Sequence, residues 1–173
     1  MIMTEVSTLQ MAGEVVWRVI NDGFFAAVAA IGFAAISNPP MRAFKYCALI
    51  AAAGHMSRFA MMNYGGCGLV AGSLVGAVVV GLLSVFIAPK VKVPPETFSF
   101  PSLLPMIPGM YAYRCLQAFI MLLEADTPDG FDRYFYLCAS NGIMTLFVIL
   151  AMVLGQLSPI LIFKRISFSS TRD

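Results

Sequence analysis

The sequence predicts an all-α integral membrane protein with about five transmembrane helices. Of its 173 residues, 60% are hydrophobic and only 12% are charged, whereas a soluble domain carries about 25% charged residues. The apolar residues form long runs, each close to the roughly 20 residues that a helix needs to cross a bilayer. Basic residues collect in alternate connections between these runs, and no basic cluster suggests nucleic acid.

The N-terminal part is expected to hold a polar segment, residues 1–14, followed by the first span at 15–37. The polar segment lacks the basic stretch and apolar run of a signal peptide, so we expect the first span to stay in the mature chain. This span should end at Asn38-Pro39-Pro40, because proline cannot continue a helix. Arg18 and Asp22 are four residues apart, so they share a helical face and are able to pair.

Four more spans complete a single transmembrane domain over residues 15–163. We expect them at residues 44–62, 69–88, 106–123 and 134–157. The third should end before Pro89, and a proline-rich connection follows at 93–101. Residues 164–173 are expected to form a cytoplasmic tail.

The basic connections predict the orientation in the membrane. Arg42 and Lys45 follow the first span, Lys90 and Lys92 follow the third, and three basic residues lie in 164–173. With five spans, all of these fall on one side, and the loop between the last two spans carries four acidic residues on the other. By the positive-inside rule, the C-terminus is cytoplasmic and the N-terminus lies outside.

Three glycines at intervals of four, Gly68, Gly72 and Gly76, lie on one stripe of the third span. Small residues at this spacing let helix backbones approach closely in lipid. We therefore predict that these glycines serve helix packing rather than substrate binding.

The first candidate site is His55 and Arg58, three residues apart on one face of the second span. His55 is eleven residues, or about 16 Å, from the cytoplasmic start of this span, which places it inside the hydrocarbon. A histidine can change protonation near neutral pH, which suits proton coupling. The alternative is that Arg58 reaches the outer headgroups and His55 only packs between helices.

The second candidate site is the stretch from Pro105 to Arg114. Pro108-Gly109 can break the fourth helix, and a helix that restarts there offers N–H groups to an anion or carboxylate. Arg114 lies about 12 Å from either end of its span, too deep to reach the headgroups easily. Its alternative role is an ion pair with a neighbouring helix. Asn141 in the fifth span is a polar residue that could complete the site.

The charges inside the spans do not balance. Arg58, Arg114 and a protonated His55 lie within spans, but the only acid close to a span interior is Asp22. Buried charges are normally paired, so we expect the missing negative charge to come from a small carboxylate-bearing substrate, a partner subunit or a second copy. The single histidine and four cysteines show no metal-ligand spacing, and we expect neither a metal nor a cofactor.

Three motifs match a known family in order and spacing. They are Asn38-x-Pro40-x-Arg42-Ala43, Gly54-His55-x-Ser57-Arg58, and Pro105-x-x-Pro108-Gly109 with Tyr113-Arg114. Over about residues 32–159 the chain resembles the threonine/serine exporter family, in particular its small membrane subunit, which corresponds to the C-terminal half of the fused exporters. Asn141 and Gly155 also lie where that family would place them.

The resemblance implies a multi-pass protein of the bacterial inner membrane that works with a separately encoded larger subunit. It implies proton-driven antiport that exports threonine and serine, and the substrates of such split pairs extend to dicarboxylates such as succinate. Tyr113 joins the candidate transport residues through this resemblance.

Two other functions stay open. A structural or assembly subunit would use the same motif residues only to contact its partner. An intramembrane enzyme would use His55, but no Ser, Asp or Cys constellation accompanies it at useful spacing, and we expect no enzymatic activity.

Overall fold

The structure is a computed structural model that describes the backbone of residues 2–163 and the side chains of residues 13–163. Throughout this range all regular structure is helical, which confirms the predicted fold class. The elements, in chain order, are α1 (Ile2–Ser37), η1 (Met41–Ala43), α2 (Phe44–Asn63), α3 (Leu69–Val91), α4 (Glu96–Leu103), η2 (Leu104–Met106), α5 (Gly109–Leu123) and α6 (Pro128–Ile162).

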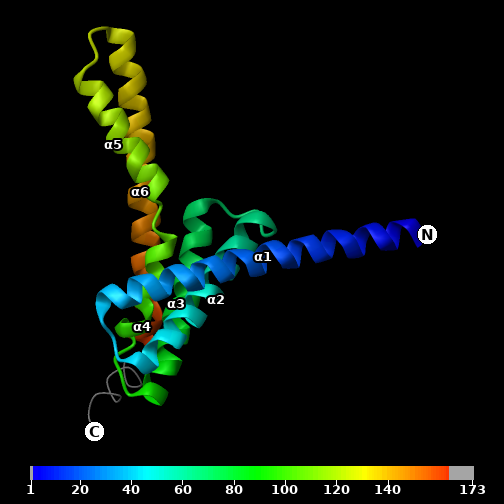
Figure 1. Ribbon diagram of the computed structural model, residues 1–173. Coiled ribbons are helices and arrows are strands. Elements are labelled where there is room, and N and C mark those ends of the chain that lie inside the picture. The colour runs from blue at the N-terminus through cyan, green and yellow to red at the C-terminus, as the bar shows by residue number, and fades with distance from the viewer. Residues whose placement is uncertain (1, 164–173) are drawn as a thin grey trace.

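The helix α3 lies at the centre of the packed region. It contacts α2 on one side and the C-terminal half of α6 on another, while α1 packs on α2 and the short α4 closes one end (Figure 1). The core is apolar and tightly filled. Its largest fully buried side chains include Phe98, Ile50, Met106, Val80 and Val148.

Helices α5 and α6 form a hairpin that projects away from this packed region (Figure 1). α5 packs mainly on α6 and leaves most of its other side chains uncovered, among them Leu116, Phe119 and Leu123. A row of exposed apolar residues of this length is what a surface in lipid or against another membrane helix requires.

The number of spans agrees roughly with the five expected. In the described part of the chain, three helices are long and apolar enough to cross a membrane, namely Gly13–Ser37 of α1, α3 and α6. Glu96–Met106 and Gly109–Leu123 pass the same test together, as a pair bent by 57°. α2 has the length of a span, at 20 residues. It is less apolar because it carries His55, Ser57 and Arg58.

The prolines act less strongly on the helices than the sequence suggested. α3 continues past Pro89 to Val91, and α6 continues past Pro159 to Ile162. The expected proline-rich connection is itself helical over Glu96–Leu103, with Pro95 directly before it. A proline at a helix start lacks only an N–H that has no partner there, which suits Pro95. Pro89 and Pro159 each remove one backbone hydrogen bond from a last turn, and the helix continues only to Val91 or Ile162.

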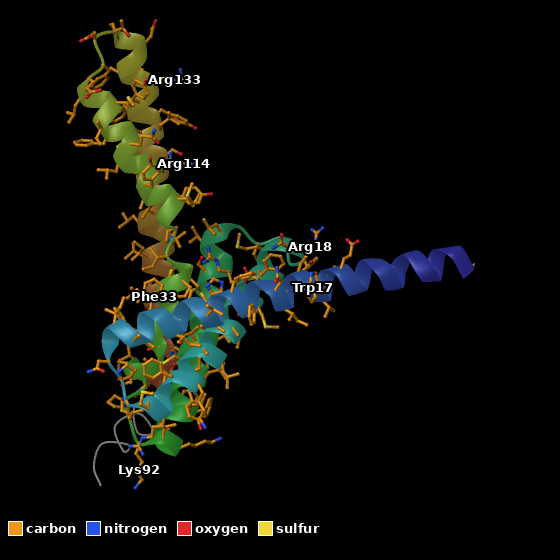
Figure 2. All side chains as sticks on the ribbon, viewed as in Figure 1. Trp17, Arg18, Phe33, Lys92, Arg114 and Arg133 are labelled. Atoms are coloured by element: carbon orange, nitrogen blue, oxygen red, sulfur yellow. The ribbon has the colours of Figure 1, made fainter. Side chains whose placement is uncertain are left out.

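The backbone of α1 ends directly before Asn38-Pro39-Pro40. α1 ends at Ser37, and Asn38 has a positive φ of 48°, a left-handed conformation that asparagine tolerates better than most residues. The next two prolines lie beside Glu96 and Thr97, so two of the basic connections meet at one end of the molecule. Lys92 lies at this end and Arg133, near the acidic loop, at the opposite one (Figure 2).

Candidate functional site

A polar cavity lies where α1, α2 and the break before α5 meet. It has a volume of about 330 Å³, and its polar lining comes from Asp22 of α1, His55 and Arg58 of α2, and Asn63 at the end of α2. Pro105, Met106 and Ile107 supply the wall formed by the broken helix. The structure thus brings His55, Arg58 and Pro105 together.

Asp22 and His55 form the polar contact between α1 and α2. The carboxylate Oδ2 of Asp22 lies 3.3 Å from Nδ1 of His55, and the histidine side chain is only 14% exposed. The other ring nitrogen, Nε2, is buried and has no hydrogen-bond partner in the described part of the chain. A buried nitrogen without a partner is costly, which makes it a natural place for a proton or a ligand to bind.

Arg58 connects α2 to the broken helix. Its guanidinium donates a hydrogen bond of 2.8 Å to the backbone carbonyl of Met106. Met106 ends η2, and the Gly109 N–H donates to Ile107 instead, so no other backbone N–H in the described part of the chain pairs with this carbonyl. The arginine therefore satisfies a carbonyl that the helix break exposes.

Glycines explain how the helices come close enough to build the cavity. A Cβ on Gly23, next to Asp22, would lie 2.6 Å from Met56 Cγ. A Cβ on Gly76 would lie 2.9 Å from the carbonyl oxygen of Gly54, and one on Gly72 would lie 2.6 Å from Met62 Cγ. The close contacts between α1, α2 and α3 thus depend on residues without a side chain.

Gly68 does not share this role, contrary to the packing prediction. It precedes α3 as its N-terminal cap, and no atom lies within 4 Å of the position where its Cβ would be. The stripe is interrupted because the helix begins only at Leu69.

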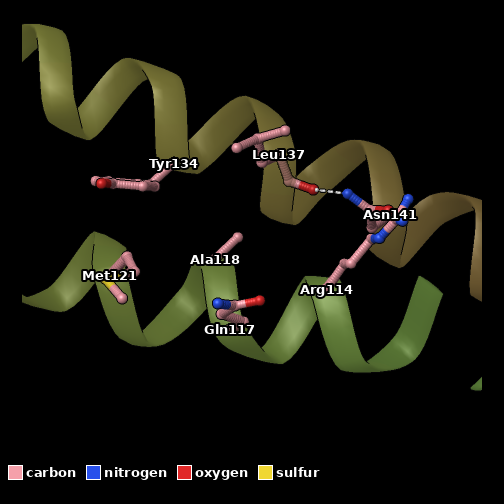
Figure 3. A pocket seen from close by; sticks show the side chains of 7 residues that line it. All are labelled: Arg114, Gln117, Ala118, Met121, Tyr134, Leu137 and Asn141. Carbon is pink, nitrogen blue, oxygen red and sulfur yellow. Dashed lines mark hydrogen bonds between the residues drawn. The ribbon is translucent and has the colours of Figure 1, made fainter. Parts of the chain in front are cut away.

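Arg114 belongs to a second cavity, inside the α5–α6 hairpin (Figure 3). This cavity measures about 480 Å³ and is lined by Arg114, Gln117, Tyr134 and Asn141 together with three apolar side chains. Asn141 donates a hydrogen bond of 2.7 Å to the carbonyl of Leu137. The described lining contains no acidic residue.

The two halves of the second predicted site are not joined. Pro108 and Gly109 do not line the Arg114 cavity, and the Gly109 N–H already donates to the carbonyl of Ile107 at 2.8 Å. Tyr113 is 60% exposed on the outer surface of α5. The restart of the helix and the arginine therefore do not converge on one anion in this structure.

Arg18 does not pair with Asp22, although their spacing on α1 would allow it. Arg18 lies 3.9 Å from Glu14, and both side chains are largely exposed, whereas Asp22 turns to His55. Sequence reasoning thus left Asp22 out of the candidate site. The signal was present, because Asp22 is the acid closest to a span interior, but helical spacing alone favoured its neighbour on the same helix.

Comparison with known proteins matches the chain to a family model and to curated relatives. A family model described as "Threonine/Serine exporter, ThrE" matches residues 22–162. A protein of Haemophilus influenzae (strain ATCC 51907 / DSM 11121 / KW20 / Rd), described as uncharacterized, is 33% identical over 148 residues, covering 86% of this chain and 48% of that protein. The chain thus spans about half the length of this curated relative. No solved structure matches the chain.

Proposed function

The chain belongs to the threonine/serine exporter family, and from that premise we propose that it is a membrane subunit of a secondary transporter. Its cargo is threonine, serine or a related small carboxylate. The subunit works in the bacterial inner membrane and exchanges its substrate for protons.

The observation that carries this proposal is the polar cavity at the helix break. Transporters commonly place their binding sites where a membrane helix is interrupted, because irregular backbone is tolerated there only if it lines a cavity or is buried in protein. Here the break before α5 adjoins a carboxylate, an imidazole and a guanidinium. Ionisable side chains are expensive inside a membrane, and such a cluster supports a substrate or ion pathway over a role in packing.

The Asp22–His55 contact supports proton coupling. A histidine titrates close to physiological pH, and a carboxylate 3.3 Å from its ring nitrogen can stabilise the protonated form. The pair therefore offers a place to load and release a proton inside the protein.

The α5–α6 hairpin supports a partner, either a larger membrane subunit of the same family or a second copy. Arg114 is exposed within a helix whose neighbours are apolar, and its cavity has no acid among the described residues. A charge near the bilayer centre costs at least about 2.5–3.5 kcal/mol without compensation. A substrate carboxylate or a partner residue at Arg114 would remove this cost.

Efflux from loaded cells tests the function. Cells are loaded with a threonine dipeptide, and the release of threonine is compared with and without the gene for this chain and its neighbouring genes. Arg58→Gln should lower the initial efflux rate by about tenfold or more, since a hydrogen bond to a charged group contributes about 1.5–3 kcal/mol.

Arg18→Gln is the matched control, because Arg18 is an exposed arginine one helical turn from Asp22. It should leave efflux unchanged. If Arg58→Gln assembles normally and exports at the normal rate, the cavity is not on the transport path. If it prevents assembly with the partner, the chain is a structural subunit instead.

A further inference from the structure

We infer that the cavity at the helix break binds an α-amino acid as a zwitterion, with Asp22 receiving its ammonium group and Arg58 its carboxylate. A proton on the Asp22–His55 pair competes with the ammonium group of the substrate for the carboxylate of Asp22. This inference rests on the proposed exporter function and specifies which cargo class the site is built for.

The charges of the cavity fit a zwitterion. Its described lining contains one carboxylate, Asp22, and one guanidinium, Arg58. An α-amino acid carries one charge of each sign on two groups bonded to the same carbon, so Asp22 and Arg58 would compensate both of its charges inside the membrane. The volume of about 330 Å³ is at the small end of the range of about 300–1,000 Å³ for small-molecule sites.

Asp22 is free enough to receive an ammonium group. Its Oδ2 faces His55, but the side chain as a whole keeps 34% of its surface exposed, compared with 14% for His55. A carboxylate accepts several hydrogen bonds through its two oxygens. Contact with His55 therefore leaves acceptor capacity toward the cavity.

Arg58 likewise keeps donors to spare. The Met106 carbonyl engages NH1, while a guanidinium offers five N–H donors in a planar fork. Its remaining edge can grip a carboxylate through two hydrogen bonds. The Met106 contact fixes the position of the arginine, so the donors are oriented before the substrate arrives.

Competition with a proton follows from the position of His55. With the imidazole neutral, Asp22 and Arg58 give the cavity a formal charge of zero. A second proton on the imidazole makes the cavity positive and turns the contact between His55 and Asp22 into an ion pair. A substrate ammonium group bound to Asp22 would lie beside the imidazolium of His55, and the two positive charges would repel each other. The imidazolium then releases its proton to water, and one substrate replaces one proton, which is the exchange that an antiporter requires.

Other ionisable groups do not disturb this exchange. On α1, the next charged residues are Arg18 and Glu14, which lie close to each other near the surface. On α2, Arg58 is the neighbour of His55. α3, on the other side of α2, has no ionisable residue between Leu69 and Ala88. The proton therefore belongs to the Asp22–His55 pair.

The same charges disfavour a dicarboxylate. Succinate could place one carboxylate on Arg58, but its second would meet the carboxylate of Asp22. Two carboxylates in contact repel each other, which lowers the affinity for succinate. The negative charge of Asp22, opposite Arg58, therefore makes the site bind amino acids in preference to dicarboxylates.

Equilibrium binding to the protein, purified in mild detergent through a tag on this chain with any subunit that it retains, tests the inference. The probes are L-threonine, 3-hydroxybutyrate, which lacks the ammonium group, L-threonine amide, which lacks the carboxylate, and succinate. Wild-type protein should bind threonine at least about tenfold more tightly than the other three, since each charge supplies a charge-assisted hydrogen bond. A pH indicator should report about one proton released per threonine bound.

The variants separate the two charges. Asp22→Asn should weaken threonine binding by about tenfold or more and leave 3-hydroxybutyrate unchanged, while Asp22→Glu should restore part of the affinity for threonine. Arg58→Gln should weaken both probes. His55→Gln should still bind threonine but release no proton, and Arg18→Gln should behave as wild type. Gel filtration of each variant shows whether it has assembled.

Several results would overturn the inference. They are equal affinity of the wild-type protein for threonine and 3-hydroxybutyrate, unchanged threonine affinity in assembled Asp22→Asn, and proton release by His55→Gln. If Asp22→Asn cells still export threonine normally, the exporter function survives and only this site is wrong. If wild-type cells export neither threonine, serine nor a related small carboxylate, the proposed function itself fails.

Discussion

Replacing Gly81 by alanine tests the packing that holds α6 against α3. A Cβ at this position would lie 2.5 Å from the carbonyl oxygen of Gln156, so α6 must retreat by about 1 Å to restore ordinary contact. Overpacking of this kind costs about 1–3 kcal/mol. The shift would also disturb the 2.6 Å hydrogen bond from Gln156 to Ser99, which contributes about 1 kcal/mol.

Within a helix, alanine is more favourable than glycine by about 1 kcal/mol of helix propensity. This gain offsets the free energy lost with the hydrogen bond from Gln156 to Ser99. We therefore expect Gly81→Ala to destabilise the protein by about 1–3 kcal/mol, or roughly a five- to hundredfold change in the unfolding equilibrium. Unfolding in mixed micelles with increasing SDS measures this change.

The matched control is Gly32→Ala on α1. No atom lies within 4 Å of its Cβ position, so alanine should be neutral or stabilise the helix by up to about 1 kcal/mol. Equal stability of the two variants would show that α3 and α6 do not approach as closely as the structure indicates.

Three further predictions concern topology and the hairpin. An alkaline phosphatase fused to the C-terminus should be inactive, because the positive-inside rule predicts a cytoplasmic C-terminus from the basic connections; an active fusion would exclude this orientation. Arg114→Lys should assemble normally but export poorly, and Arg114→Gln should export less still, because lysine lacks the planar fork that grips a carboxylate; normal efflux from the glutamine variant would rule out the carboxylate role. Cys115 and Cys138 have sulfur atoms 3.7 Å apart across the hairpin, so mild oxidation should protect both from maleimide labelling, and persistent labelling of both would contradict the observed register.

The sequence predicted the fold class because apolar length and composition determine it almost alone. It also located the break at Pro105–Gly109, since two prolines and a glycine leave a membrane helix few alternatives. The short helix α4 was missed because Pro95 and Pro101 suggested a connection. Proline disfavours a helix interior but suits a helix start, and sequence alone did not distinguish these positions here.

The candidate site was only partly predictable. His55 and Arg58 stood out because polar residues are rare in membrane spans. Asp22 had the same property, yet its contact with His55 joins residues 33 positions apart. Such a contact depends on how α1 crosses α2, which the close approach at Gly23 sets. Periodicity within one helix carries no information about that crossing.

The two arginines differ in what surrounds them, and this difference indicates which part of the chain most needs another component. Arg58 has a carbonyl acceptor and a carboxylate in its own cavity, so its charge is compensated within this chain. Arg114 lies on a projecting hairpin whose cavity has no acid among the described residues. The chain spans about half the length of its curated relative, and helices that expose long apolar surfaces require a neighbour or lipid. A charge in that surface does not suit lipid. Arg114 in the hairpin therefore needs a negative charge from another component, either a passing substrate carboxylate or a second membrane subunit. The charges of the cavity at the helix break, in contrast, are compensated by residues of this chain.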